Sequence, residues 1–160
     1  MEPMRSWTSE HRAIEANSAG RDFLIAESFA RVTGRALVPE GSDPCAALWA
    51  LPAVVVAHGT QADPVFFYGN RAALELFEMR AEDFVRMPSR LSAEAAGREA
   101  RARLMARVAA DNFVPDYSGV RVSASGRRFR IEGATVWNLL DADGANHGQA
   151  AVFDRWTQLA

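Results

Sequence analysis

Apolar residues recur at helical spacing through the first part of the chain. This spacing predicts helices within residues 7–38, with a break at Gly20 and an end at Gly34. Phe23 begins the apolar stripe of the second helix, so that stripe is expected to face a core or a partner. A turn-rich connector follows it. Residues 1–44 are therefore expected to form an N-terminal helical extension.

The remaining pattern alternates between short apolar runs, which are typical of strands, and stretches with helical spacing. The expected strands cover residues 53–57, 65–68, 117–123, 127–140 and 148–156. The expected helices between the second and third strands cover residues 71–78, 81–85 and 93–110. The chain thus reads as a strand hairpin, a helical crossover and a three-stranded meander.

This order predicts an α+β fold with a five-stranded antiparallel sheet, because its strands are joined by hairpins or by one crossover. The helices are expected to cover one face of that sheet. The arrangement is that of a PAS-like sensor domain. We expect a PAS-like core over residues 45–160, which forms a single structural domain with the extension.

Composition limits the functions that remain open. The net charge of −2 gives no basic footprint, so no nucleic-acid partner is expected. All 18 basic residues are arginine, which excludes a Schiff-base lysine and a P-loop lysine. The longest apolar stretch, residues 45–57, is interrupted by Pro52 and is shorter than the roughly 20 residues of a membrane span. Together with the single cysteine, this predicts a cytoplasmic protein without a membrane partner.

Several motifs resemble those of a known family. The main one is the run from His58 to Asn70, HGTQADPVFFYGN. The shorter ones are Met87–Glu94, Tyr117–Ser123, Gly126–Phe129, Val136–Asn138 and Gly148–Ala151. This set resembles the MEKHLA domain, a PAS-related family, in its stand-alone bacterial form. The resemblance implies a PAS-like fold with ligand or partner sensing.

The plant members of that family carry the domain at the C-terminus of homeodomain–leucine zipper factors. The present sequence shows no homeodomain, zipper or basic region, so a transcription-factor role is not carried over. The leading hypothesis is a small-molecule-binding or interaction module that acts on a partner in trans. Its N-terminal amphipathic helices are the expected interface, either with another protein or in a homodimer.

A ligand in such a fold lies between the sheet and its helices, in an apolar pocket with a few polar groups. The candidate ligand-binding residues are His58, Gln61, Tyr68, Arg90, Tyr117, Arg121, Trp137 and Gln149. Each has a simpler structural role as an alternative. Arg90 and Arg121 can clamp an anion or form salt bridges, and Trp137 can wall the pocket or fill the core.

A small enzyme in the same cleft is the alternative function. His58 would act as general base, Asp63 or Tyr117 would assist it, and Arg90 or Arg121 would clamp an anion. A purely structural dimerisation domain is the third possibility. These three functional hypotheses can be distinguished by asking whether the side chains converge on one cavity.

Known PAS cofactors do not match the sequence. A flavin–cysteinyl adduct needs a cysteine on the helix after the second strand, whereas Cys45 precedes the first strand. Haem needs an axial ligand on the crossover helix, where residues 93–110 offer Met105 but no histidine or cysteine. The three histidines lack metal-ligand spacing, so no metal site is predicted. The identity of the ligand stays open.

Overall fold

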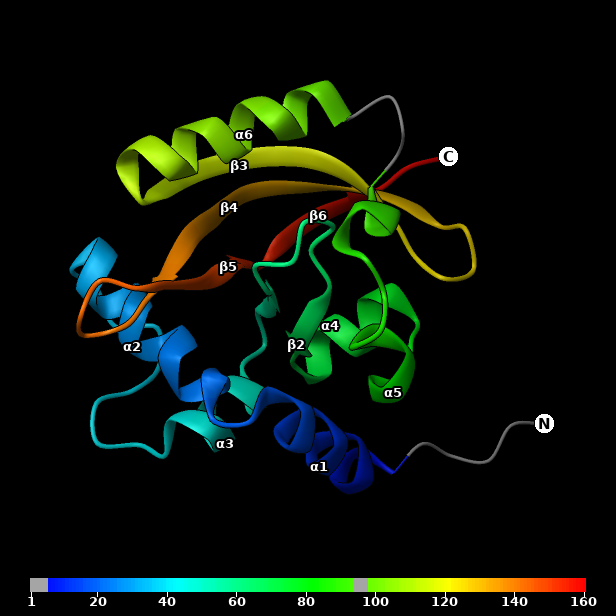
Figure 1. Ribbon diagram of the computed structural model, residues 1–160. Helices are drawn as coiled ribbons and strands as arrows, with labels where there is room; N and C mark the ends of the chain where they lie inside the picture. The colour runs from blue at the N-terminus through cyan, green and yellow to red at the C-terminus, as the bar shows by residue number, and fades with distance from the viewer. Residues whose placement is uncertain (1–5, 94–97) are drawn as a thin grey trace.

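One antiparallel sheet organises the structure, a computed structural model that describes residues 6–93 and 98–160 (Figure 1). Its strands are β1 (Val54–His58), β2 (Phe66–Gly69), β3 (Phe113–Val122), β4 (Arg128–Leu140), β5 (Asn146–Phe153) and β6 (Arg155–Gln158). Five of them follow the order β2-β1-β5-β4-β3, and β6 pairs with β4. This confirms the α+β class and the antiparallel sheet predicted from the sequence.

The last expected strand, 148–156, is two strands, so the sheet has six strands within the described residues where five were expected. β5 pairs with the second half of β4, and β6 pairs with the first half. The change of partner falls at Asp154 and opposite Gly133, whose φ of 62° lies in the left-handed region. A side chain at position 133 would also meet the guanidinium of Arg155, so glycine suits this kink on both grounds.

Seven helical segments accompany the sheet within the described residues. They are α1 (Trp7–Ser18), α2 (Arg21–Thr33), α3 (Pro44–Ala50), α4 (Arg71–Phe77), α5 (Ala81–Phe84), the 3₁₀-helix η1 (Ser89–Ser92) and α6 (Arg98–Asp111). Gly20 separates α1 from α2, and Gly34 ends α2 in the left-handed conformation, as predicted. The crossover helix was expected over residues 93–110, but Ala93 forms an isolated bridge with Arg121, and residues 94–97 lie outside the described residues.

Helices cover both faces of the sheet, not one as predicted. Val136 and Trp137 are neighbours on β4 and therefore point to opposite faces, yet they are only 7% and 0% exposed. Val136 packs with Leu104 and Val108 of α6 on what we call the inner face. Trp137 meets Phe29 of α2 edge to face on the outer face, at 4.9 Å between ring centroids. Figure 1 shows α6 and α2 on opposite sides of β4.

The N-terminal helices are part of the core of the sheet domain. Ile14, Ile25 and Phe29 belong to the same buried cluster as Trp137. The hydroxyl of Ser28 donates to the carbonyl of Asn138 at 2.7 Å and accepts from the amide of Leu140 at 2.9 Å, which joins α2 to β4. The apolar face of the N-terminal helices, which was expected to bind a partner, thus packs against the sheet. A homodimer through these helices stays a prediction.

The predicted stripe of α2 was wrong at its first residue, because Phe23 is 51% exposed while Ile25 and Phe29 face the sheet. The position of a helix against its neighbours depends on the helix's rotation about its axis. Several apolar residues lie close to the stripe of α2, and only the packing decides which of them are buried.

Asn70 joins three elements where β2 leads into α4. Its side-chain oxygen accepts from the amides of Ala73 at 3.1 Å and Val55 at 3.0 Å, which confirms the predicted helix cap. Its amide group donates to the carbonyls of Leu48 at 3.0 Å and Ala53 at 2.9 Å. Since the residue is fully buried, these bonds replace the water that four backbone groups would otherwise require.

We expect Asn70→Ala to lower the free energy of unfolding by at least about 3 kcal/mol, because it leaves several buried backbone groups unpaired. The measurement is urea unfolding followed by circular dichroism. Asn17→Ala is the matched control: this exposed asparagine makes one side-chain bond, to the carbonyl of Phe67. The loss of this bond should lower the free energy of unfolding by about 1 kcal/mol or less. Similar losses for the two variants would contradict the role assigned to Asn70.

Candidate functional site

A cavity of about 70 Å³ lies between the inner face of the sheet and the segments α4, η1 and α6. Its apolar wall includes Phe66, Ile131, Val136 and Phe153. Its polar lining consists of His58, Ser89, Ser92, Arg101, Tyr117, Arg121 and Gln149. An apolar pocket with a few convergent polar groups is typical of small-molecule sites. This one is smaller than the usual several hundred Å³.

Arg101 reaches the cavity from α6. Its guanidinium donates to the hydroxyl of Ser89, which belongs to η1. Burial lowers the pKa of Arg101, and the nearby positive charge of Arg121 lowers it further. Arginine nevertheless keeps its proton in proteins. The cavity therefore has two cationic side chains on its wall, one from a helix and one from a strand.

Arg121 lies on β3 and is held by Tyr117 of the same strand. Its guanidinium donates to the Tyr117 hydroxyl at 3.0 Å and lies 5.3 Å from the centre of the tyrosine ring. It also donates to the carbonyl of Val120 at 3.0 Å. The residue between them on this face is Gly119, where a Cβ atom would overlap the Tyr117 hydroxyl. The glycine thus permits the contact that orients Arg121.

His58 ends β1 and faces the cavity beside Gln149 of β5, its register partner. Its Nδ1 lies 3.0 Å from the carbonyl oxygen of Gly59, so the neutral ring carries its proton there and leaves Nε2 as an acceptor. Burial is the main cause that lowers the pKa of His58, and the charge of Arg101 adds to it. The imidazole is therefore neutral near pH 7.

Four of the eight predicted ligand-binding residues converge on this cavity: His58, Tyr117, Arg121 and Gln149. Alternation along paired strands explains why. Side chains of register partners share a face, and His58 pairs with Gln149 across β1 and β5. The positions of Tyr117 and Arg121 on β3 differ by an even number, which places both side chains on one face.

The other four predicted residues do not line this cavity, and a ligand-binding role for them stays a prediction. Gln61 is exposed in the β1–β2 turn and accepts from the amide of Val65. Arg90 pairs with Asp63 at 3.1 Å on the surface, with about half of each side chain exposed. Tyr68 and Trp137 are fully buried on the outer face. The simpler structural roles are the ones observed here: Arg90 forms a salt bridge and Trp137 packs in the core.

Three polar residues of the cavity were missed by the sequence analysis: Arg101, Ser89 and Ser92. Arg101 could have been predicted from the helical pattern. Arg101 precedes the buried Leu104 by one helical turn, so both residues lie on the same face of the helix. Ser89 carried no comparable signal. The short 3₁₀-helix that brings it to the cavity has no periodic pattern of its own.

The geometry proposed for a small enzyme is not assembled here. Asp63 was expected to orient the imidazole of His58, but the Nδ1 of His58 faces the Gly59 carbonyl. The carboxylate of Asp63 binds Arg90 instead. Tyr117 does line the cavity, where its hydroxyl accepts from Arg121. The described residues thus give His58 no carboxylate partner to stabilise an imidazolium.

The sheet order, the helical crossover and the cavity on the inner face define a domain of the PAS class. The chain belongs to the MEKHLA domain family, whose model matches residues 12–158. A curated relative, the homeobox-leucine zipper protein ATHB-14 of Arabidopsis thaliana, is 29% identical over 98 residues. That match covers 61% of this chain but only 12% of the relative. The bacterial stand-alone form is not borne out, since the curated relatives are plant proteins.

Solved structures support the fold assignment. A PAS domain from Colwellia psychrerythraea superposes with a TM-score of 0.60 at 11% identity, covering 71% of this chain and 92% of that one. A PAS domain of a LuxR-family transcriptional regulator from Burkholderia thailandensis, in complex with ethanol, has a TM-score of 0.56 at 16% identity. The match covers 74% of this chain and 98% of that one. At these identities the likeness shows the fold alone.

The helices of the described residues give no candidate for a membrane span, since none is both long and apolar enough.

The burial of His58 predicts a pH dependence of stability. Because its pKa is lowered in the folded state, the unfolded chain binds the proton at a higher pH than the folded chain does. The contribution of His58 to stability is thus present above about pH 6.5 and is lost as the pH falls toward the lowered pKa. We expect His58→Gln to make this fall shallower in urea unfolding at about pH 5 to 7.5.

His147→Gln is the control, because that imidazole is exposed in the β4–β5 turn, where it contacts Asp141. A change of slope as large as that of His58→Gln would mean that burial of the ring is not the cause. Burial also lowers the pKa of His11, so part of the fall should remain in His58→Gln. Equal slopes for the wild type and His58→Gln would show that the cavity does not desolvate this ring.

Proposed function

We propose that this chain is a sensory module that binds a small organic anion in the inner cavity and passes the signal to a partner protein. The observation that carries the proposal is the charge of the cavity. Arg101 and Arg121 line it, and within residues 6–93 and 98–160 no carboxylate does. The nearest acidic group that acts on Arg101, Asp63, is engaged with Arg90 outside it.

Two partly desolvated cations on one small wall repel each other, and an anion between them would offset that repulsion. Guanidinium groups match carboxylates well, because their fixed fork of donors can form two parallel hydrogen bonds. The neutral His58 and Gln149 can each add a hydrogen bond to such a ligand. The polar lining thus favours a carboxylate over a cation or an uncharged group.

The apolar wall and the size of the cavity limit the rest of the ligand. Phe66, Phe153 and Val136 line the same space, which suits a short hydrocarbon tail. A cavity of about 70 Å³ accommodates a few heavy atoms and is too small for flavin or haem. The Burkholderia thailandensis PAS domain holds ethanol, a molecule of that size. We therefore propose a short-chain carboxylate.

The contacts of Arg101 give a physical route for the signal. Its bond to Ser89 connects α6 with η1, and the amide of Ser89 bonds to the carbonyl of Pro64 at 2.8 Å. A ligand carboxylate would compete with the Ser89 hydroxyl for the guanidinium. Binding would thereby change the contact between α6 and η1, the surface that we propose a partner reads.

Thermal unfolding with matched ligand pairs tests this proposal. Acetate, propionate and butyrate are compared with acetamide, propionamide and butyramide, which are similar in shape but uncharged. We expect at least one carboxylate to raise the melting temperature while its amide does not, because only the anion pairs with the arginines. Equal effects of acids and amides at constant ionic strength would contradict an anion site.

Variants of two arginines on α6 provide the matched comparison. Arg101→Met should weaken carboxylate binding by about 10- to 100-fold, the usual effect of losing a charged hydrogen bond. Arg103→Met is the control, since Arg103 is 71% exposed and pairs with Glu99 on the same helix. If Arg103→Met weakened binding as much as Arg101→Met, the effect would be one of net charge and the cavity would not be the site.

A further inference from the structure

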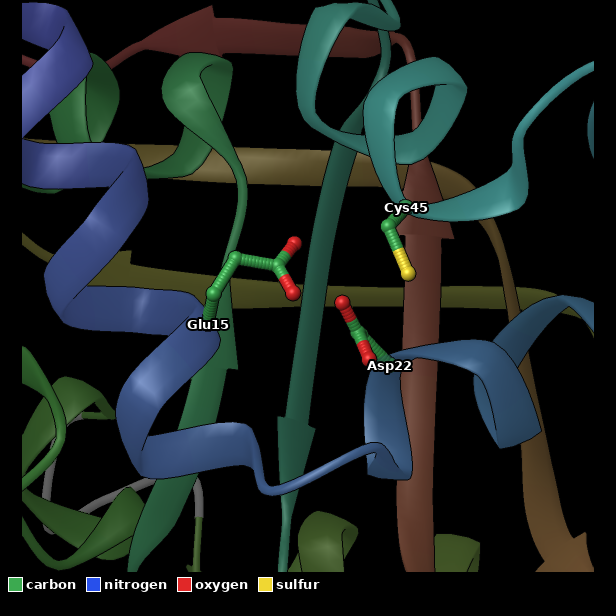
Figure 2. Close-up of side chains that lie close together, drawn as sticks. All are labelled: Glu15, Asp22 and Cys45. Atoms are coloured by element: carbon green, nitrogen blue, oxygen red, sulfur yellow. The ribbon is translucent and has the colours of Figure 1, made fainter.

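A second group of polar side chains lies on the other side of the sheet, among the N-terminal helices. Glu15 of α1, Asp22 of α2 and Cys45 of α3 each present one potential metal-ligand atom, and these atoms all lie within 4.8 Å of one another. Figure 2 shows the two carboxylates and the thiol pointing toward one another from three different helices. No spacing pattern along the chain marks this group, because each residue comes from its own helix.

One carboxylate oxygen of this group is buried and accepts no hydrogen bond from the described residues outside the group. Asp22 is 1% exposed, yet its Oδ2 atom has no hydrogen-bond partner among the described residues. Its other oxygen accepts from the amide of Phe23 at 2.9 Å. Native proteins rarely bury a carboxylate oxygen unpaired, because water would otherwise solvate it. Asp22 therefore has an open acceptor directed at Glu15 and Cys45.

A second buried polar atom without a partner lies beside the same group. Tyr68 of β2 is fully buried, and its hydroxyl makes no hydrogen bond within the part of the chain that the structure describes. Burial raises the pKa of Tyr68, and the neighbouring acidic groups Asp22, Glu15 and Cys45 raise it further. The phenol is thus close enough to these groups to interact with them electrostatically.

Electrostatics in the group favour a cation. Burial and the neighbouring Asp22 raise the pKa of Glu15 to about 7 and that of Cys45 to about 12. The protein by itself therefore keeps Cys45 as a thiol, which argues against a reactive nucleophile at this position. A bound divalent cation reverses this balance, because it stabilises the thiolate and both carboxylates at once.

We propose that Glu15, Asp22 and Cys45 bind a zinc-class divalent metal ion. The thiolate selects a borderline or soft ion over Mg²⁺ and Ca²⁺, and two carboxylates and a thiolate are known types of zinc ligand. Glu15 and Cys45 are half-buried, so an ion can enter from solvent while Asp22 forms the floor. Binding breaks the S–H bond of Cys45, forms a metal–sulfur bond and releases the proton to water.

His11 supplies support for Glu15 from the next layer. Its Nε2 lies 2.9 Å from the Glu15 carboxylate, and its ring stacks on Trp49 at 4.5 Å between centroids. Such outer contacts fix the orientation of a ligating carboxylate. A metal at this position would join α1, α2 and α3, the helices that cover the outer face. This makes the site a structural one, separate from the inner cavity.

Cobalt substitution of the untagged full chain tests the proposal. We expect one Co²⁺ per chain and a thiolate-to-cobalt charge-transfer band in the near ultraviolet, which Zn²⁺ abolishes by displacing Co²⁺. Calorimetry of Zn²⁺ binding in buffers of different ionisation enthalpy should show proton release. A folded wild-type chain that binds no Co²⁺, or binds it without a charge-transfer band, would overturn the proposal.

Three variants locate the site. Cys45→Ser should lose the charge-transfer band, and Asp22→Asn should weaken Zn²⁺ binding by at least about 100-fold, which exceeds most outer-shell effects. Glu40→Gln is the control, because it removes an exposed carboxylate in the loop before α3 and should bind Zn²⁺ as the wild type does. Circular dichroism confirms that each variant is folded. Equal weakening by Glu40→Gln and Asp22→Asn would mean non-specific binding and would refute the site.

Discussion

The structure depends on a sheet that is apolar on both faces. Along β4, adjacent residues such as Val136 and Trp137 are both buried, although alternation sends their side chains to opposite sides. Such a strand is stable only if each face has its own cover. Helix α6 supplies one cover, and the N-terminal helices supply the other, through Phe29 and the buried hydroxyl of Ser28. The N-terminal segment is thus an essential layer of the domain.

These two layers create two different chemical environments. On the inner face, α6 and η1 approach β3, and arginines and neutral polar groups line the cavity there. On the outer face, three helix segments meet over β2, and carboxylates and a thiol gather there. The inner cavity and the outer group differ in charge because different helices, with different polar side chains, face the two sides of the sheet. One fold can therefore offer an anion site and a cation site without interference.

The inner cavity is small because large side chains fill most of the space beneath the helices. Phe66, Phe77 and Phe84 pack against one another, with ring centroids 4.5 and 5.9 Å apart. What remains is a narrow space beside Arg101 and Arg121. Close packing of this kind makes the position of a helix sensitive to the presence of a few atoms, because packed side chains have few alternative arrangements. The contact between Arg101 and Ser89, on which the proposed ligand would act, lies beside this packed cluster.

The sequence by itself determined the elements, their antiparallel pairing and the class of the fold, because periodicity and turn residues are local properties. It also placed His58, Tyr117, Arg121 and Gln149 at one site, since strand alternation and pairing set their faces. The tertiary structure alone decided the rest. It turned Tyr68 and Trp137 to the outer face, paired Arg90 with Asp63, and brought Arg101 to the cavity and Cys45 to Glu15 and Asp22. These placements depend on the rotation and docking of whole helices, which result from packing across many residues distant in sequence.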